Sequence, residues 1–285
     1  MAASTMLRAA LPSIPIVNQL PGVKKSGREA TLHASGTVTV DRERVGAYAR
    51  VCGFPAKDTA PLTFPHVLAF ATQMRMMTSP DFPFPAIGTI HLANSITQHR
   101  PVSVGEELTF EVHTRGPGPH PKGRTIDFLV AMHVGEEPVW ESTSTYLRLG
   151  HGDGEADGRG STDALPPVPG RVTWRLDGGV GRRYAAVSGD HNPIHLYPLT
   201  AKALGFRRQI AHGMWSLARC VATLENRLPD AVSLEAAFKK PIFLPGTVAF
   251  GQEPADDGIA FALTSPGTGA PHLLARTRAV TPSPT

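Results

Sequence analysis

The sequence is poor in cysteine, and this scarcity excludes two ways of holding a fold together. Its 285 residues include only two cysteines, Cys52 and Cys220. They stand alone, without the paired spacing of a structural zinc site, and a disulfide framework needs more of them. We therefore expect a protein of a reducing compartment and assign it to the cytoplasm.

Long apolar runs and long runs of one charge are also missing. No stretch approaches the roughly 18 consecutive apolar residues of a membrane-spanning helix. The net charge is +4, but the basic residues are scattered in pairs such as Lys24-Lys25 and Arg182-Arg183. They form no basic tail of the kind that binds nucleic acid. We therefore expect no membrane span and no nucleic-acid partner, and anionic small molecules suit this charge pattern better.

A segment rich in glycine, aspartate and proline, residues 150–170, divides the chain into two nearly equal parts. Such a composition cannot bury much apolar surface, so we expect an exposed linker. Residues 1–30 are expected to form a loose N-terminal arm; a transit peptide is the alternative, but it would normally hold more arginines. The remaining segments, 31–149 and 171–285, are predicted to be the two domains.

The two domains resemble distant copies of one plan. Their matching segments keep the same order, although the spacing drifts: Tyr48–Gly53 with Tyr184–Gly189, His66–Ala71 with His212–Leu217, and Arg100–Gly105 with Lys240–Gly246. Each domain is predicted to begin with an apolar helix, at residues 66–77 and 212–226. In the first domain strands are expected at 88–99, 107–115, 125–134 and 139–149, with turns at 116–119 and 135–138. Short turns imply antiparallel pairing, so each copy should be an α+β unit.

The residues most suited to chemistry lie in one loop of the second domain. Asp190 and His195 are five residues apart, and Pro193 prevents a continuous helix between them. An imidazole that titrates near neutrality and a carboxylate can together activate one water. The alternative is that Asp190 and Asn192 only form turns and that His195 packs.

A helix start follows this loop at His212 and Gly213. The N-terminus of a helix offers unpaired N–H groups and a partial positive charge to a developing oxyanion. Gly213 has no side chain to obstruct the approach. Alternatively, His212 is an ordinary capping or packed residue and Gly213 an ordinary helix-start glycine.

Taken together, three segments resemble the MaoC-like, R-specific enoyl-CoA hydratases, also called hydratase 2. These are Tyr184–His195, Ala201–Phe206 and Ile210–Met214. The resemblance covers residues 171–279 well, and the first half only in general plan, as in the double-hotdog members of that family. It implies a hotdog fold in each half, a long helix wrapped by a curved antiparallel sheet, with the two copies paired as a monomeric pseudo-dimer or a homodimer.

The resemblance also implies roles for individual residues. Asp190 and His195 match the family's acid/base pair, Asn192 the position between them, and Gly213 the glycine whose N–H holds the thioester oxygen. The implied reaction is the reversible hydration of a trans-2-enoyl thioester to the (3R)-3-hydroxyacyl product, in fatty-acid metabolism. It needs no metal and no redox cofactor.

Other residues are predicted to contact the substrate. Ser188, Gly189 and His212 flank the loop, whereas Arg207, Arg208 and Lys240 offer cations to coenzyme A phosphates or to an acidic acyl carrier protein. Solvated surface is the alternative for these basic residues. The histidines of the first half show no metal-ligand spacing.

The first half departs from the motif, because after Gly53 it lacks an acid and an imidazole at matching spacing. We therefore expect one active site per chain. The apolar side chains of the first predicted helix either line a tunnel for an acyl tail or belong to an ordinary core: Phe64, Phe70, Met74, Met76 and Met77.

Two other functions remain open at this point. Hotdog proteins include thioesterases, which also use an activated water. A catalytically silent acyl-binding subunit is the third reading, and the intact loop argues against it.

Overall fold

The computed structural model describes residues 31–85, 89–150, 152, 154–155, 165–255 and 257–280. The predicted arm, residues 1–30, and most of the predicted linker lie outside the described residues. No helix in the described part is long and apolar enough to cross a membrane.

The first half has one strand, two helices and then four strands. They are β1 (His33–Thr39), α2 (Arg42–Cys52), α3 (Phe64–Thr78), β2 (Thr89–Gln98), β3 (Glu107–His120), β4 (Gly123–Val134) and β5 (Glu137–Leu149).

The second half repeats this order with short helical additions. They are β6 (Val172–Leu176), α4 (Val180–Ser188), η3 (Pro193–His195), α5 (Pro198–Ala203), α6 (Gly213–Leu224), η4 (Glu225–Arg227), β7 (Val232–Phe238), β8 (Gly246–Ala255), β9 (Gly258–Thr264) and β10 (Pro271–Ala279).

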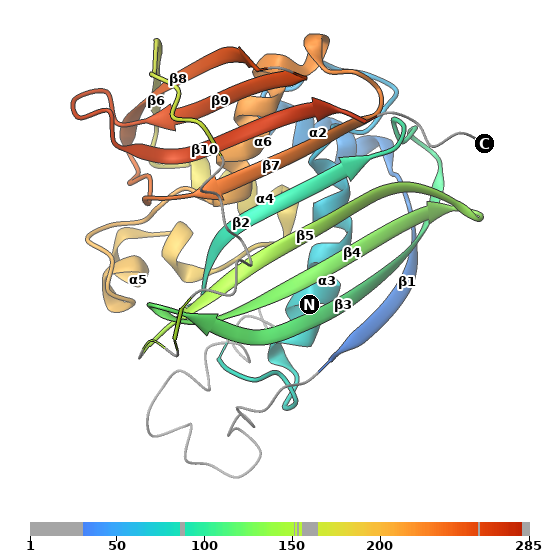
Figure 1. Ribbon diagram of the computed structural model, residues 1–285, viewed down its shortest axis with the longest axis horizontal. Helices are drawn as coiled ribbons and strands as arrows, with labels where there is room; N and C mark the ends of the chain where they lie inside the picture. The colour runs from blue at the N-terminus through green and yellow to red at the C-terminus, as the bar shows by residue number, and fades with distance from the viewer. Residues whose placement is uncertain are drawn as a thin grey trace.

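All ten described strands form one antiparallel sheet, in the order β1-β3-β4-β5-β2-β7-β10-β9-β8-β6 (Figure 1). The order is symmetric about its centre, because each strand of one half has its counterpart at the same distance on the other side. The halves join where β2 pairs with β7, from Ala93 opposite Ala237 to Gln98 opposite Val232. The topology therefore confirms the internal repeat predicted from the sequence.

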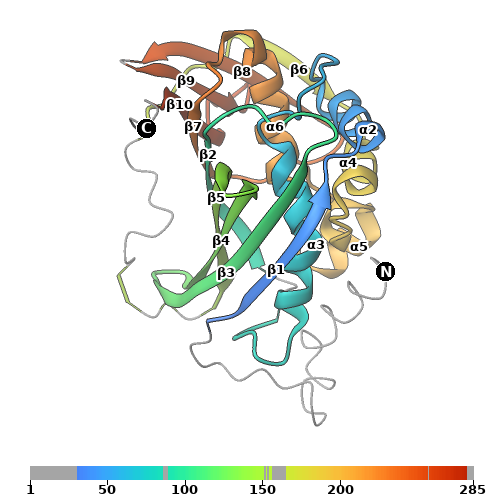
Figure 2. The same ribbon diagram turned by 90° about the vertical axis from the view of Figure 1, so that its right-hand side faces the viewer.

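The main helices lie on one face of this curved sheet (Figures 1 and 2). Nearly every residue of α3 is buried, which agrees with its apolar composition on all sides. Trp140 of β5 is also buried, and its indole N–H donates to the carbonyl of Leu62 at 2.9 Å, just before α3 begins. The helix is thus fixed to the sheet at the end where His66 lies.

Several sequence predictions require correction. A strand and a shorter helix precede each long helix, so the apolar helix does not come first in either half. Residues 116–119 do not form a turn; they extend β3, which pairs with β4 as far as His120 opposite Gly123. The linker is not exposed throughout, because Leu165 and Val168 are buried against the second half of the sheet. The α+β architecture itself is as predicted.

Candidate active site

Three successive hydrogen bonds shape the loop after α4. In each of them a side-chain oxygen accepts the backbone N–H of the residue two positions later. Gly189 ends α4 with a φ of 77° and turns the chain into the loop. Ser188 Oγ accepts the N–H of Asp190 at 3.1 Å, Asp190 Oδ1 accepts that of Asn192 at 3.1 Å, and Asn192 Oδ1 accepts that of Ile194 at 3.4 Å. Asp190 and Asn192 therefore do form turns, and these turns also fix the direction of the carboxylate.

His195 is held in one tautomer by the backbone. Its Nδ1 lies 2.9 Å from the carbonyl oxygen of Ile210, which can only accept, so Nδ1 carries the proton. In the neutral ring Nε2 is then a lone-pair acceptor. His195 is 9% exposed, and burial lowers the pKa of its imidazole below the ordinary value, although the negative charge of Asp190 opposes this shift. A neutral base is therefore available near pH 7.

Gly181 allows α4 to pack directly against the backbone of this histidine. A Cβ atom at residue 181 would lie 2.0 Å from the carbonyl oxygen of His195. The glycine-rich segment 178–181 thus has a packing role at the site.

His212 supports the same loop from the other side. Its ring stacks on that of His195 with centroids 3.7 Å apart, and its Nε2–H donates to the backbone carbonyl of Asp190 at 3.0 Å. Burial holds the pKa of His212 well below its usual range. A carboxylate oxygen of Asp190 and one ring nitrogen each of His195 and His212 all lie within 4.8 Å of one another, so the three side chains converge.

Gly213 is the first residue of α6, where a backbone N–H has no partner within the helix. A Cβ atom there would lie 3.0 Å from the ring of Phe238 on β7. The glycine therefore lets the ring of Phe238 approach the start of α6. Gly213 and Phe238 both line the same cavity.

This cavity has a volume of about 290 Å³ and lies between the two halves of the chain. The second half contributes the loop and the start of α6. The first half contributes α3 and the facing ends of β2 and β5, with side chains that include His66, Val67, Phe70, Thr89, His91 and Tyr146.

The predicted substrate contacts divide into two groups. Ser188, Asn192, His212 and Lys240 line the cavity with Asp190, His195 and Gly213, whereas Gly189, Arg207 and Arg208 do not. The two arginines line a smaller pocket of about 160 Å³, and both pockets share Pro241, Ile242 and His272. Arg207 lies over the ring of Phe243, 4.0 Å from its centroid.

The five apolar residues of α3 that were candidates for a tunnel divide in the same way. All five belong to the hydrophobic core, and three of them, Phe70, Met74 and Met77, also line the cavity, as a tunnel would require.

Three polar rings of the first half that line the cavity escaped sequence prediction: His66, His91 and Tyr146. The repeat supplied a signal for one of them, since the segments beginning at His66 and His212 correspond. The correspondence is inexact, because His66 is the third residue of α3 whereas His212 precedes α6.

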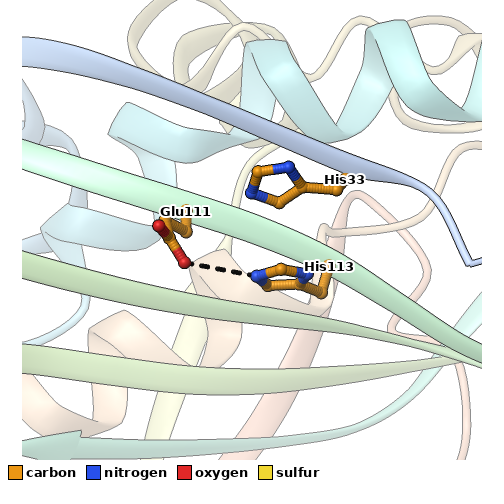
Figure 3. Close-up of side chains that lie close together, drawn as sticks. All are labelled: His33, Glu111 and His113. Carbon is orange, nitrogen blue, oxygen red and sulfur yellow. Dashed lines mark hydrogen bonds and ion pairs between the residues drawn. The ribbon is translucent and has the colours of Figure 1, made fainter.

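A separate group of side chains that could hold a metal ion lies on the edge strand β1 and its neighbour β3 (Figure 3). His33 and His113 are cross-strand partners whose rings stack at 4.4 Å, and His113 Nε2 lies 3.3 Å from Glu111 Oε2. Cross-strand pairing brings these residues together, so sequence spacing could not reveal the group. None of them lines the cavity.

Two family models match the chain, one in each half. Residues 180–260 match the MaoC like domain, and residues 30–116 match the FAS1-like dehydratase domain region. The first match contains the loop, the start of α6 and Phe238.

Known proteins extend this likeness to nearly the whole chain. The 3-hydroxyacyl-thioester dehydratase X of Mycobacterium tuberculosis is 36% identical over 277 residues, which is 96% of each chain. An (R)-specific enoyl-CoA hydratase of Aeromonas caviae is 33% identical over 78 residues, 26% of this chain and 58% of that protein. A crystal structure of HtdX from M. tuberculosis superposes with a TM-score of 0.77 at 35% identity, covering 88% of this chain and 100% of that one.

Proposed function

Because the chain belongs to the MaoC-like family of double-hotdog dehydratases, we propose that it catalyses the reversible addition of water to trans-2-enoyl thioesters. The product would be the (3R)-3-hydroxyacyl thioester. The observation that carries the proposal is the single tautomer of His195, whose Nε2 is a neutral acceptor on a ring that lies close to the carboxylate of Asp190.

In the hydration direction, Asp190 and His195 hold one water against C3 of the substrate. His195 Nε2 takes a proton from this water as its oxygen bonds to C3, and the double-bond electrons move towards the thioester carbonyl. The imidazolium so formed lies beside the negative charge of Asp190, which stabilises it. His195 then gives the proton to C2, so both elements of water are added and the pair is regenerated.

The negative charge that grows on the thioester oxygen needs a donor. We assign this role to the N–H of Gly213, which its position at the positive end of the α6 dipole supports. His212 acts as a positioning residue, because it holds the loop through Asp190 and supports the ring of His195. Hydration changes no overall oxidation state, so the proposed reaction needs no redox cofactor.

The carrier of the acyl group would enter over the basic residues at the cavity rim. Lys240 lines the cavity and Arg207 and Arg208 line the adjoining pocket, which supports a contact of these cations with phosphates of coenzyme A or of a carrier protein.

The proposal is tested by an assay of crotonyl-CoA hydration. The reaction is monitored by the loss of enoyl absorbance, and chiral analysis gives the stereochemistry of the product. Asp190→Asn and His195→Ala should each lower kcat by at least about a hundredfold, the usual contribution of a positioned acid or base. His191→Ala is a matched control, because His191 belongs to the same loop but does not line the cavity. It should stay within about threefold of wild type, a small fraction of that contribution.

Retention of near-wild-type turnover by both Asp190→Asn and His195→Ala would contradict the proposal. Release of free thiol, measured in the same reaction, would show thioester hydrolysis instead. Circular dichroism of each variant confirms that the fold is intact.

A further inference from the structure

Three polar rings lie on the wall of the cavity formed by the first half, and they are here called the first-half polar cluster: His66 of α3, His91 of β2 and Tyr146 of β5. His91 and Tyr146 are cross-strand partners with stacked rings 4.5 Å apart. The rings of His66 and His91 lie 6.2 Å apart and nearly parallel, at 21°. The three rings therefore form one group facing one space.

The protein itself leaves part of this cluster without hydrogen bonds. His66 is 3% exposed, and neither its Nδ1 nor the buried Nε2 of His91 has a partner among the described residues. A buried polar atom without a partner is destabilising, because it has lost its hydrogen bonds to water, so a fold rarely keeps two of them close together. Their place on a cavity wall indicates that a ligand supplies the partner.

The charge state of the cluster limits the chemistry of that partner. Burial lowers the pKa of His66 to about 4 and that of His91 to about 3, so both imidazoles are neutral near pH 7. A neutral imidazole offers one donor and one acceptor. This combination of a donor and an acceptor suits an uncharged oxygen, such as that of a hydroxyl or a keto group, better than a phosphate or a carboxylate.

The position of His66 along α3 shows which part of the substrate meets it. The negative charge of Asp190 acts to raise the pKa of His66, against the larger effect of burial. His66 therefore lies at the end of the cavity near Asp190, where the proposed reaction takes place. Phe70, Met74 and Met77 follow on the same side of the helix. At a rise of 1.5 Å per residue they lie about 6, 12 and 16 Å farther along the axis. An acyl chain that leaves the catalytic loop along α3 meets the imidazole first and the apolar residues afterwards.

We propose that the preferred substrates are enoyl thioesters with a hydroxyl or keto oxygen on the first carbons beyond the double bond, and that His66, with His91 beside it, binds this oxygen. This substrate class rests on the proposed hydratase function and refines it.

The test compares two substrates, trans-2-hexenoyl-CoA and its 5-hydroxy derivative. Wild type should hydrate the hydroxylated substrate with a kcat/KM at least about tenfold higher, since a site built to hydrogen-bond a hydroxyl rejects the analogue that lacks it. In His66→Phe this ratio should fall to about one, because the apolar ring cannot bind the oxygen. His66→Gln keeps a donor and an acceptor and should restore part of the preference.

Met76→Leu is the matched control, because Met76 is buried on the same helix but does not line the cavity. It should leave the ratio unchanged. A wild-type ratio near one, or a ratio that persists in His66→Phe, would overturn the substrate class. If His66→Phe does not fold, His91→Phe is measured in the same way and must also lower the ratio.

Measurements of binding affinity distinguish a failure of this inference from a failure of the proposed function. Calorimetric affinities of the two thioesters for Asp190→Asn should show the same preference without turnover. Absence of hydration with either substrate would refute the function, whereas equal affinities would refute the oxygen-binding cluster alone.

Discussion

Replacement of Gly181 by alanine is the sharpest test of how the fold positions the base. The added methyl carbon would lie 2.0 Å from the carbonyl oxygen of His195 and 3.0 Å from its carbonyl carbon. Both neighbours are backbone atoms, which cannot turn away as a flexible side chain can. Ordinary contact requires a separation of about 3.4 Å, so α4 and the backbone of His195 must move apart by about 1.4 Å.

A shift of this size should be costly for the reaction. Misplacement of a catalytic group by about 1 Å can lower the rate about a hundredfold, and we expect a loss of that order in kcat/KM for crotonyl-CoA. Overpacking of a well-packed site also costs about 1–3 kcal/mol of stability, which thermal unfolding will report. Activity must therefore be measured at a temperature where circular dichroism shows the variant to be folded.

Gly178→Ala provides the matched control from the same glycine-rich segment. Its added carbon would lie 3.6 Å from Gln209 Nε2, an ordinary contact, so activity should stay close to wild type. Turnover by Gly181→Ala within about threefold of wild type, far short of the expected hundredfold loss, would refute the claim that this glycine positions His195.

Two further predictions concern pH and chain length. Since His195 must be neutral to act as the base and burial lowers its pKa, kcat/KM should rise with pH through a pKa below 6.5 and then level off; an acid limb centred above 6.5 in the pH profile would contradict this assignment. Met74→Trp should narrow the apolar end of the cavity, so kcat/KM for trans-2-decenoyl-CoA should fall by about tenfold or more relative to crotonyl-CoA. An unchanged ratio between the two chain lengths would show that the acyl tail does not run along α3.

The sequence predicted best those features that are local or repeated. The loop residues Asp190 and His195 lie within one short segment, so the sequence could predict that their side chains come together. The two long helices were recognisable from apolar residues at helical intervals. The match of Tyr48–Gly53 with Tyr184–Gly189 marked corresponding segments of the two halves, and in the structure each segment ends a helix at a glycine with a positive φ.

Features made by contacts between distant segments could not be predicted in this way. The site combines the loop of the second half with His91 and Tyr146, which meet because β2 pairs with β5. The role of Gly181 depends on a backbone atom 14 residues away, at His195, that no spacing rule connects to it. Residues 116–119 were mistaken for a turn because their prolines and glycines outweigh the pairing of β3 with β4, which the local sequence does not show.

The symmetry of the sheet brings the proposed catalytic loop of the second half against the first half of the chain. The β2–β7 junction places each half against the other, so that α3 of the first half faces the loop of the second across the shared cavity. The first half therefore contributes to the site although it lacks an acid and an imidazole at the matching spacing after Gly53. Its own helix and strands supply the apolar wall and the first-half polar cluster instead. On this view, sequence changes in α3 alter which acyl chain is accepted, whereas changes in the loop after Gly189 alter whether water is added.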